Sequence, residues 1–297
     1  MHSPLISEVL IIYNPKSTGA GQTLADAFKQ ALALAMPGLK VTVMATMHQG
    51  HAEELAAEYA SRKGILLISA SGDGGYNELI NGIMKSTTDA NRPLCAVLPA
   101  GNANDHHREL SSGHLLANIQ KGLVRELDLL RVDYVARNGR PQTRYAHSYI
   151  GLGISSTVGD RLNQTTLNAV NEKIIAARSF LAASSVTIQH GAKLMEVDSI
   201  VFTNIGRMAK FWNVSQGSSP DDGLFEIQIV QHKSQWHKVA QFAKMTSKKT
   251  PLVRQASRYD FAVFERTLMQ LDGEIVNVAG DTQVTVKTAH KALKTIL

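Results

Sequence analysis

The sequence has a single cysteine, Cys95, which excludes an internal disulfide and a cysteine-based metal site. Cys95 lies in the apolar run 94–98, a setting typical of a buried, inert thiol. No apolar run approaches the roughly 18 residues that a membrane-spanning helix requires. The first residues also lack the basic and apolar segments of a secretory signal. We therefore expect a cytoplasmic protein.

Acidic side chains are absent from residues 227–259, although the whole chain carries a net charge of only +6. The same stretch contains Lys233, Lys238, Lys244, Lys248, Lys249, Arg254 and Arg258. Apolar residues recur within it at spacings of three and four, so we expect a basic amphipathic helix. Its basic side chains form either a solvated helix face or a surface attracted to anionic lipid. Nothing aromatic or motif-like favours nucleic acid as a partner.

The N-terminal part of the chain repeats a pattern of strand, polar loop and helix. Short apolar runs at residues 9–13, 41–44, 65–68 and 94–98 are typical of buried parallel strands. A polar loop and a helical pattern follow each run. Right-handed crossovers place all four loops at the carboxyl edge of one parallel sheet, where such proteins bind ligands.

The third of these loops is rich in glycine. Gly72, Gly74 and Gly75 surround Asp73 between a strand and a helical pattern. Glycines permit positive φ and close backbone approach, and the helix beyond them offers amide groups to an anion, so the loop fits phosphate. A carboxylate there would repel phosphate unless it served a metal ion or a proton. The alternative is that Asp73 caps a tight turn.

The pattern changes after Asp128. Alternating or apolar runs, including residues 144–150 and 197–204, follow one another through turn signals, and a helical pattern recurs at residues 167–183. We expect a mostly antiparallel second domain. The predicted division is residues 1–128 for an α/β domain and residues 129–287 for a β domain.

Five motifs in this order resemble the diacylglycerol kinase catalytic-domain family, which includes bacterial soluble lipid kinases and sphingosine kinases and is distantly related to NAD kinases. They are Asn14-Pro15-Lys16-Ser17, Ser71-Gly72-Asp73-Gly74-Gly75-Tyr76-Asn77-Glu78, Leu98-Pro99-Ala100-Gly101-Asn102-Ala103-Asn104-Asp105, Asp221-Asp222-Gly223-Leu224-Phe225 and Leu271-Asp272-Gly273-Glu274. The resemblance covers essentially the whole chain. It implies an N-terminal α/β domain, a C-terminal β-sandwich, and residues 288–297 returning to the first domain.

The resemblance also implies site residues for ATP and Mg²⁺. The residues expected around the nucleotide are Asn14, Pro15, Lys16, Ser17, Thr18, Thr46, Gly72, Asp73, Gly74, Gly75, Tyr76, Asn77, Glu78, Asn102 and Asp105. Asp73 and Asp105 would organise phosphate, metal and water, and Glu274 would be the general base for a lipid hydroxyl. Asp128 matches a position near the acceptor. A structural Mg²⁺ would be held by Ser219, Asp222 and Leu224.

Two positions depart from the family pattern: Gly75 and Asn102 stand where threonine is usual. Asn102 retains the ability to bond phosphate or ribose, but Gly75 does not. The family's aromatic and small residues after Asp105 are replaced by His106, His107 and Arg108, and we expect the histidines to be exposed on a helix.

The predicted function is an ATP-dependent lipid kinase acting at a membrane surface, cytoplasmic and peripheral on the inner membrane. A homodimer is left open. The alternatives are a kinase for a soluble acceptor, as NAD kinase is, and a nucleotide- or lipid-binding regulatory protein without turnover. A Rossmann dehydrogenase is disfavoured because the first loop lacks the Gly-x-Gly-x-x-Gly pattern.

Overall fold

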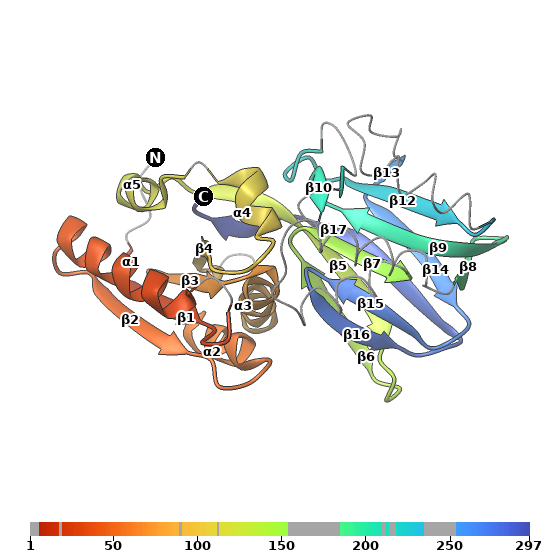
Figure 1. Cartoon of the computed structure of the whole chain (residues 1–297), viewed down its shortest axis with the longest axis horizontal. Coiled ribbons are helices and arrows are strands. Elements are labelled where there is room, and N and C mark those ends of the chain that lie inside the picture. The colour runs from red at the N-terminus through yellow and green to blue at the C-terminus, as the bar shows by residue number, and fades with distance from the viewer. Residues whose placement is uncertain are drawn as a thin grey trace. The chain divides into compact units, whose positions relative to one another are not determined.

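The computed structural model describes residues 6–17, 20–88, 91–111, 113–153, 185–208, 212–213, 218–234 and 254–297 (Figure 1). The chain divides into two compact units, Met1–Asp128 with Lys291–Leu297, and Leu129–His290. Within the described ranges, no helix is both long and apolar enough to cross a bilayer. The helical pattern predicted at 167–183 and residues 235–253 of the basic stretch lie outside the described residues.

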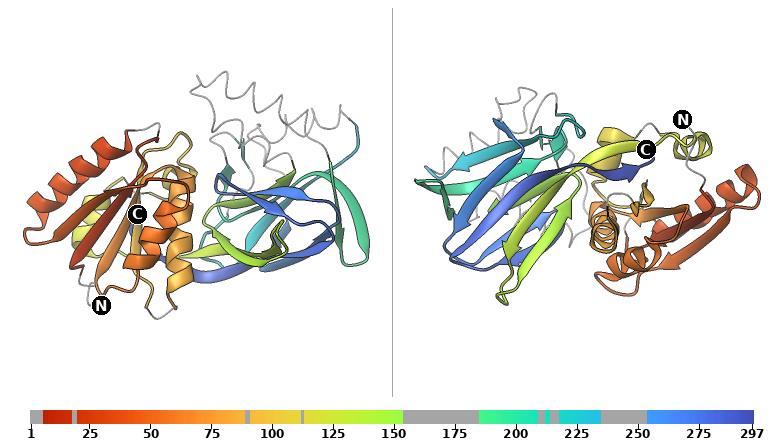
Figure 2. Two further views of the ribbon diagram at one scale, coloured as in Figure 1. Left: turned by 90° about the horizontal axis from the view of Figure 1, so that it is seen from below. Right: turned by 180° about the vertical axis from the view of Figure 1, so that it is seen from behind.

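The first unit is a parallel sheet covered by helices on both faces, as the strand, loop and helix pattern predicted. Its elements are β1 (Glu8–Tyr13), α1 (Gly21–Ala35), β2 (Lys40–Ala45), α2 (His51–Tyr59), β3 (Ile65–Ser71), α3 (Asp73–Ser86), β4 (Leu94–Pro99), α4 (Asp105–Leu110) and α5 (Leu115–Lys121). The strand order is β2-β1-β3-β4, with every neighbouring pair parallel. Figure 2 shows α1 on one face of this sheet and α3 on the other.

Burial explains this arrangement. All seven residues of β3 are buried, as expected for a central strand that is covered on both faces. On one face Ala25 and Leu32 of α1 pack against Val9 and Ile11 of β1. The helix ends at Ala35, just before Pro37, because proline cannot continue the backbone hydrogen bonding of a helix.

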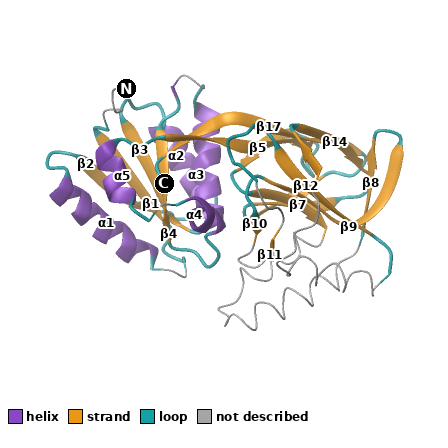
Figure 3. Ribbon diagram, turned by 90° about the horizontal axis from the view of Figure 1, so that it is seen from above, coloured by secondary structure: helices purple, strands orange, loops and turns teal. Residues whose placement is uncertain are grey.

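The second unit consists of strands in the part of the chain that the structure describes (Figure 3). Two of its strands, β5 (Arg125–Val135) and β17 (Thr282–Thr295), begin or end in the first unit. The others are β6 (Pro141–Ala146), β7 (Tyr149–Gly153), β8 (Val186–His190), β9 (Lys193–Thr203), β10 (Arg207–Met208), β11 (Trp212–Asn213), β12 (Phe225–Gln231), β13 (Arg254–Ala256), β14 (Arg258–Val263), β15 (Thr267–Leu271) and β16 (Glu274–Val278). The strand order runs β16-β15-β7-β9-β8-β14-β17 with antiparallel pairs, as predicted.

The core of the second unit follows the alternation of its strands. In β14, Tyr259, Phe261 and Val263 are buried while the residues between them are partly exposed. Such a period of two places one face of the sheet in the core. The ring of Phe202 meets that of Phe225 edge-on, with centroids 5.8 Å apart. Aromatic pairs in this geometry stabilise a core beyond the area that they bury.

The end of the chain completes the first sheet. Thr295 of β17 lies beside Cys95 of β4 in parallel register, and the amide of Ile296 donates to the Cys95 carbonyl over 2.9 Å. The Ile296 side chain is 1% exposed and belongs to the core of the first unit. Cys95 is buried, as predicted, and desolvation raises the pKa of its thiol to about 11. A thiol in this state is a poor nucleophile.

Candidate functional site

The loops that follow β1, β3 and β4 meet at the carboxyl edge of the first sheet. The Ala100 amide donates to the Ser71 carbonyl over 3.0 Å, and the Ser17 hydroxyl donates to the Ala100 carbonyl over 2.5 Å. The loop after β2 is attached as well, because the Thr46 amide donates to the Tyr13 carbonyl over 2.9 Å. The structure thus brings together the four loops that the sequence placed at one edge.

Asp73 is the first residue of α3, and its carboxylate contacts the beginning of another helix. One oxygen accepts the Asp105 amide over 3.1 Å, and the other accepts the His106 amide over 3.4 Å. These amides belong to the first turn of α4, where backbone N–H groups have no partner within the helix. A negative charge there also interacts favourably with the helix dipole. Asp73 and Asp105 are therefore fixed together, 32 positions apart in sequence.

The glycines beside Asp73 serve close packing rather than unusual dihedral angles. None of Gly72, Gly74 and Gly75 has a positive φ, which corrects that part of the sequence interpretation. A Cβ added to Gly72 would lie 3.1 Å from the Gly101 Cα, so the two loops touch through their backbones. A Cβ added to Gly75 would collide with the Ser71 side chain, 2.8 Å from its Cβ. The site therefore has no room for a side chain at Gly75, and a side chain at Gly72 would press on the Gly101 backbone.

The histidines that follow Asp105 differ from expectation. His106 is 1% exposed, and its ring lies beside that of Tyr76 with centroids 5.3 Å apart. The prediction that His106 is exposed is wrong, because α4 turns this side chain onto α3. His107 is partly buried, and desolvation lowers its pKa, with Arg108 adding to the effect and Asp73 opposing it. A neutral imidazole is therefore favoured beside the Asp73 carboxylate.

Three residues of the glycine motif are engaged inside the first unit. The Tyr76 hydroxyl lies 3.4 Å from both the Cys95 Sγ and the Thr295 Oγ1. The Asn77 side chain accepts a bond from Asn81 over 3.0 Å. Glu78 is 8% exposed, and its carboxylate accepts the amides of Gly50 and Ala52 at the start of α2, over 2.9 and 3.2 Å. Tyr76 thus connects α3 to β4 and β17, Asn77 is bound within α3, and Glu78 holds the start of α2.

The remaining nucleotide candidates lie in the loops themselves. The Asn14 side chain accepts the Lys16 amide over 2.9 Å, which shapes the turn that contains Pro15 and leads to Ser17. Asn102 is exposed, and Thr18 lies outside the described residues. The Asn104 side chain forms two bonds with the Gly101 backbone, at 2.9 and 2.7 Å. The sequence interpretation did not single out Asn104, whose positive φ of 51° is common for asparagine in turns.

Asp128 is 1% exposed, and its carboxylate accepts the Lys291 amide over 2.6 Å. Lys291 has a positive φ of 49°, and the bond fixes this bend in β17. Asp128 and Lys291 are also the residues at which the chain leaves and re-enters the first unit. The structure thus gives Asp128 a role in holding the returning segment.

In the second unit, Asp272 is fully buried and binds a backbone segment far from it in sequence. Its carboxylate accepts the amides of His147, Ser148 and Tyr149 over 2.6, 3.0 and 2.8 Å, and the His147 Nε2 lies 3.3 Å away. These bonds interrupt the single strand predicted at 144–150 and separate β6 from β7. The sequence signal for this break was the polar pair His147-Ser148 within an apolar run.

Asp272 and Gly273 also form the two-residue turn of the β15–β16 hairpin. Their φ values are 48° and 99°, and Leu271 pairs with Glu274 across the turn. Positive φ at both central positions is the geometry for which Asp-Gly is preferred in tight hairpins. Glu274 is the first residue of β16 and is partly exposed. The buried Asp272 therefore fixes the backbone from which the Glu274 side chain extends.

Residues 219–224, where the sequence predicted a structural Mg²⁺, contain an Asx-type turn. The Asp222 carboxylate accepts the Leu224 amide over 2.9 Å, and Gly223 has a φ of 81°. The Ser219 hydroxyl donates to Asp221 over 2.5 Å. Asp222 is exposed, and a carboxylate oxygen keeps a second lone pair when it accepts one bond. Carboxylate and carbonyl oxygens are the ligands that Mg²⁺ prefers, so the residues fit this ion.

Comparison with known proteins relates this geometry to a family. Residues 8–132 match the model of the diacylglycerol kinase catalytic domain. A diacylglycerol kinase of Bacillus subtilis is 26% identical over 286 residues, covering 89% of this chain and 88% of that protein. One of Staphylococcus saprophyticus is 28% identical over 283 residues, with the same coverage of both chains.

Solved structures share the fold. A diacylglycerol kinase from Bacillus anthracis str. Sterne superimposes with a TM-score of 0.69 at 21% identity, covering 98% of this chain and 96% of that one. Yeast NADH kinase complexed with NADH gives a TM-score of 0.55 at 14% identity, covering 98% and 82%. The resemblance to the diacylglycerol kinase family is therefore confirmed, and the two-part fold is the one seen in these structures.

Proposed function

Because residues 8–132 match the diacylglycerol kinase catalytic domain, we propose that the protein is an ATP-dependent kinase that phosphorylates a lipid hydroxyl. The observation that carries this proposal is the bond between the Asp73 carboxylate and the Asp105 amide at the carboxyl edge of the parallel sheet. This bond joins two aspartate residues of neighbouring loops, and the backbones of Gly72 and Gly101 in the same loops approach each other closely. Phosphoryl transfer requires positioning and charge neutralisation, and this edge supplies groups for both.

The nucleotide would bind against loop backbones. Gly72 is the N-cap of α3 and offers no side chain, so phosphate oxygens can approach the first turn of a 14-residue helix. The loop of Asn14 to Ser17 lies against Ala100 through the Ser17 hydroxyl. Lys16 and Asn102 are exposed and provide polar groups at the rim. Buried Tyr76, Asn77 and Glu78 would act indirectly by keeping these loops in place.

A divalent metal ion belongs to this chemistry, and the residues fit one. The Asp73 carboxylate lies beside the first turn of α4, where it accepts two backbone amides, and carboxylate oxygens are ligands that Mg²⁺ prefers. Asp105, which is 4% exposed, carries a second carboxylate on the residue whose backbone amide Asp73 accepts. Bound Mg²⁺ would supply positive charge that neutralises the charge developing on the phosphate oxygens during transfer. Asp73 and Asp105 would hold its water shell in a fixed position.

For the acceptor we propose Glu274 as the general base. Its carboxylate would take the proton of the lipid hydroxyl as that oxygen attacks the γ-phosphorus of ATP, while the bond from this phosphorus to the β-phosphate oxygen breaks and ADP leaves. Asp272 positions it by fixing the hairpin turn through three backbone amides. A protein that acts on a lipid must also reach the membrane surface, and the basic residues within 227–259 are proposed to attract it to anionic lipid.

The test is a product-resolved kinase assay with ATP and Mg²⁺ on a panel of diacylglycerol, monoacylglycerol, phosphatidylglycerol, a sphingoid base and NAD. Phosphorylation of one lipid class that is lost in Asp105→Asn would support the proposal, and Asp26→Asn on the exposed face of α1 is the control. Phosphorylation of NAD alone would identify a soluble acceptor. Tight ATP or lipid binding without any product would indicate a binding protein without turnover.

A further inference from the structure

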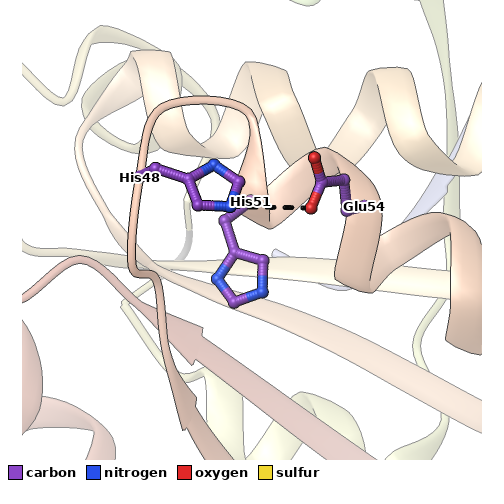
Figure 4. Close-up of side chains that lie close together, drawn as sticks. All are labelled: His48, His51 and Glu54. Carbon is purple, nitrogen blue, oxygen red and sulfur yellow. Dashed lines mark ion pairs between the residues drawn. The ribbon is translucent and has the colours of Figure 1, made fainter.

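Three potential metal ligands surround the turn between β2 and α2. They are His48 in the turn, His51 at the first position of α2, and Glu54 one helical turn later (Figure 4). Residues three apart on a helix lie on the same face, which explains why His51 and Glu54 are neighbours. One ligand atom from each of the three side chains lies within 4.8 Å of the other two.

The distances suit a shared cation better than direct bonds. His48 Nε2 and Glu54 Oε2 are 3.8 Å apart, too far for a good hydrogen bond. Two ligands on one tetrahedral Zn²⁺, at bond lengths near 2.1 Å, would be about 3.4 Å apart. The side chains of His48 and Glu54 are 55% and 66% exposed, so small rotations can close this difference.

The hydrogen bond of His48 selects the nitrogen that a metal needs. Its Nδ1 lies 3.0 Å from the Gln49 carbonyl oxygen. A carbonyl only accepts, so Nδ1 carries the hydrogen, and in the neutral ring the lone pair is then on Nε2, the nitrogen that lies 3.8 Å from Glu54. Metal-binding histidines commonly donate their second ring nitrogen to a carbonyl in this way.

His51 requires one exchange. Its Nδ1 accepts the Met47 amide over 3.0 Å, so in the neutral ring Nε2 carries the hydrogen. To bind a cation, the ring must release this amide, either to offer the Nδ1 lone pair itself or to move the proton from Nε2 to Nδ1. The bond is exposed and Met47 itself is 76% exposed, so water can replace His51 as the partner of that amide. Breaking this bond should therefore cost little free energy. Because it must be broken first, His51 should bind the metal most weakly of the three ligands.

We propose that His48, His51 and Glu54 bind one borderline divalent transition-metal ion such as Zn²⁺, with water in the remaining position. Two imidazoles and a carboxylate favour Zn²⁺, Co²⁺ or Ni²⁺, whereas Mg²⁺ prefers oxygen ligands alone. The site is thus chemically distinct from the Mg²⁺ of the proposed kinase reaction. It belongs to the first unit, and its three ligands lie within residues 48–54.

The experiment uses the full chain after chelator treatment, titrated with Co²⁺ and followed by visible absorption, with Zn²⁺ as competitor. We expect one Co²⁺ per chain, displaced by Zn²⁺, and a loss of affinity of about tenfold or more in both His48→Gln and Glu54→Gln. His114→Gln, which removes an exposed histidine elsewhere in the first unit, should bind as the wild type does. Circular dichroism confirms that each variant is folded.

Two results would overturn the site. One is that wild type shows no Co²⁺ band at millimolar metal, which would leave His48 and Glu54 as an exposed ion pair. The other is equal affinity in wild type, His48→Gln and Glu54→Gln, which would locate the metal elsewhere. The Co²⁺ absorption band and the metal affinities are measured without a kinase assay. They therefore test the metal site even if the protein is not a lipid kinase.

Discussion

The carboxylate of Asp73 accepts the backbone amide of Asp105 over 3.1 Å, and this bond joins the loops that follow β3 and β4. Its second oxygen accepts the next amide, that of His106. The sequence offered two roles for Asp73, a chemical group or a cap of its own turn. The structure adds a third, because Asp73 caps α4, a helix that begins 32 positions later.

Asp73→Asn should therefore lose stability as well as activity. Asparagine keeps one acceptor oxygen, but its amide nitrogen would face a backbone N–H group, so α4 loses a charged cap. We expect a decrease in the free energy of unfolding of about 1–2 kcal/mol. Urea unfolding measures the decrease, and Asp26→Asn on the exposed face of α1 is the control. Unchanged stability with abolished turnover would limit Asp73 to a chemical role.

Glu78 allows a second test of capping across the fold. Its carboxylate accepts the amides of Gly50 and Ala52, which otherwise lack partners at the start of α2. Glu78→Gln keeps the size but loses the charge, and we expect a loss of about 1–2 kcal/mol in the free energy of unfolding. The control is Glu58→Gln. Glu58 is exposed on α2, the helix that Glu78 caps, and its substitution should change the free energy of unfolding by less than about 0.5 kcal/mol. Equal effects of the two variants would contradict the capping role.

The strands of the first unit could be predicted because their chemistry is local. The short apolar run that begins β3 is typical of a strand buried on both faces, and parallel order follows from the helical patterns between the runs. Parallel order in turn places the loops with Asn14, Asp73 and Asn102 at one edge. The sequence alone therefore predicted that these loop residues lie near one another.

The carboxylates that hold distant segments in place could not be predicted, because their hydrogen-bond partners are backbone amides. Asp73 binds α4, Glu78 binds α2, and Asp272 binds residues 147–149. Amides are identical along the chain and leave no trace in the sequence. The same limit explains β5, which continues from Arg125 to Val135 through the change of pattern at Asp128. Burial of His106 depended on the direction of a six-residue helix, which no periodicity could fix.

The departure from the family pattern at Gly75 leads to a third prediction. A Cβ at Gly75 would collide with the Ser71 side chain, which also bonds to the Ser69 hydroxyl over 2.6 Å. Gly75→Ala should therefore lower the free energy of unfolding by about 1–3 kcal/mol despite the higher helix propensity of alanine. In Ser71→Gly the obstructing atoms are gone, and the same change should then be tolerated.

The measurement is a double-mutant cycle by chemical denaturation. We expect Gly75→Ala to cost at least about 1 kcal/mol less in the Ser71→Gly background than in the wild type. Gly82→Ala is the matched control, because its Cβ would collide with the Glu53 carbonyl oxygen and the Ala56 side chain of α2, and not with Ser71. Its cost should be the same in both backgrounds. Additive effects of Ser71 and Gly75 would show that the two positions do not share space.

In the β15–β16 hairpin, the proposed general base Glu274 and the residue that positions it, Asp272, can be tested separately. Glu274→Gln should lower kcat by about 10² or more, while stability changes by less than about 0.5 kcal/mol, since Glu274 is partly exposed. Asp272→Asn should instead lower the free energy of unfolding by about 3 kcal/mol, because a buried charge bonded to three amides is lost. Steady-state kinetics with thermal unfolding separates the two effects. An equal loss of ATP affinity and kcat in Glu274→Gln would make this residue a nucleotide or metal ligand.

The turn at Asp222 provides the last prediction, which concerns bound metal. The Asp222 carboxylate holds the turn through the Leu224 amide and is exposed, so Mg²⁺ can bind its remaining lone pairs together with the carbonyls of Ser219 and Leu224. Binding to the folded chain alone raises the free energy of unfolding as Mg²⁺ is added. Asp222→Asn retains the oxygen that accepts the Leu224 amide but removes the charge. We therefore expect Tm to rise with Mg²⁺ in the wild type and in Glu265→Ala, an exposed control in the same unit, and to rise less in Asp222→Asn. The same increase in all three proteins would show that Mg²⁺ stabilises the chain at another place and that this turn needs no ion.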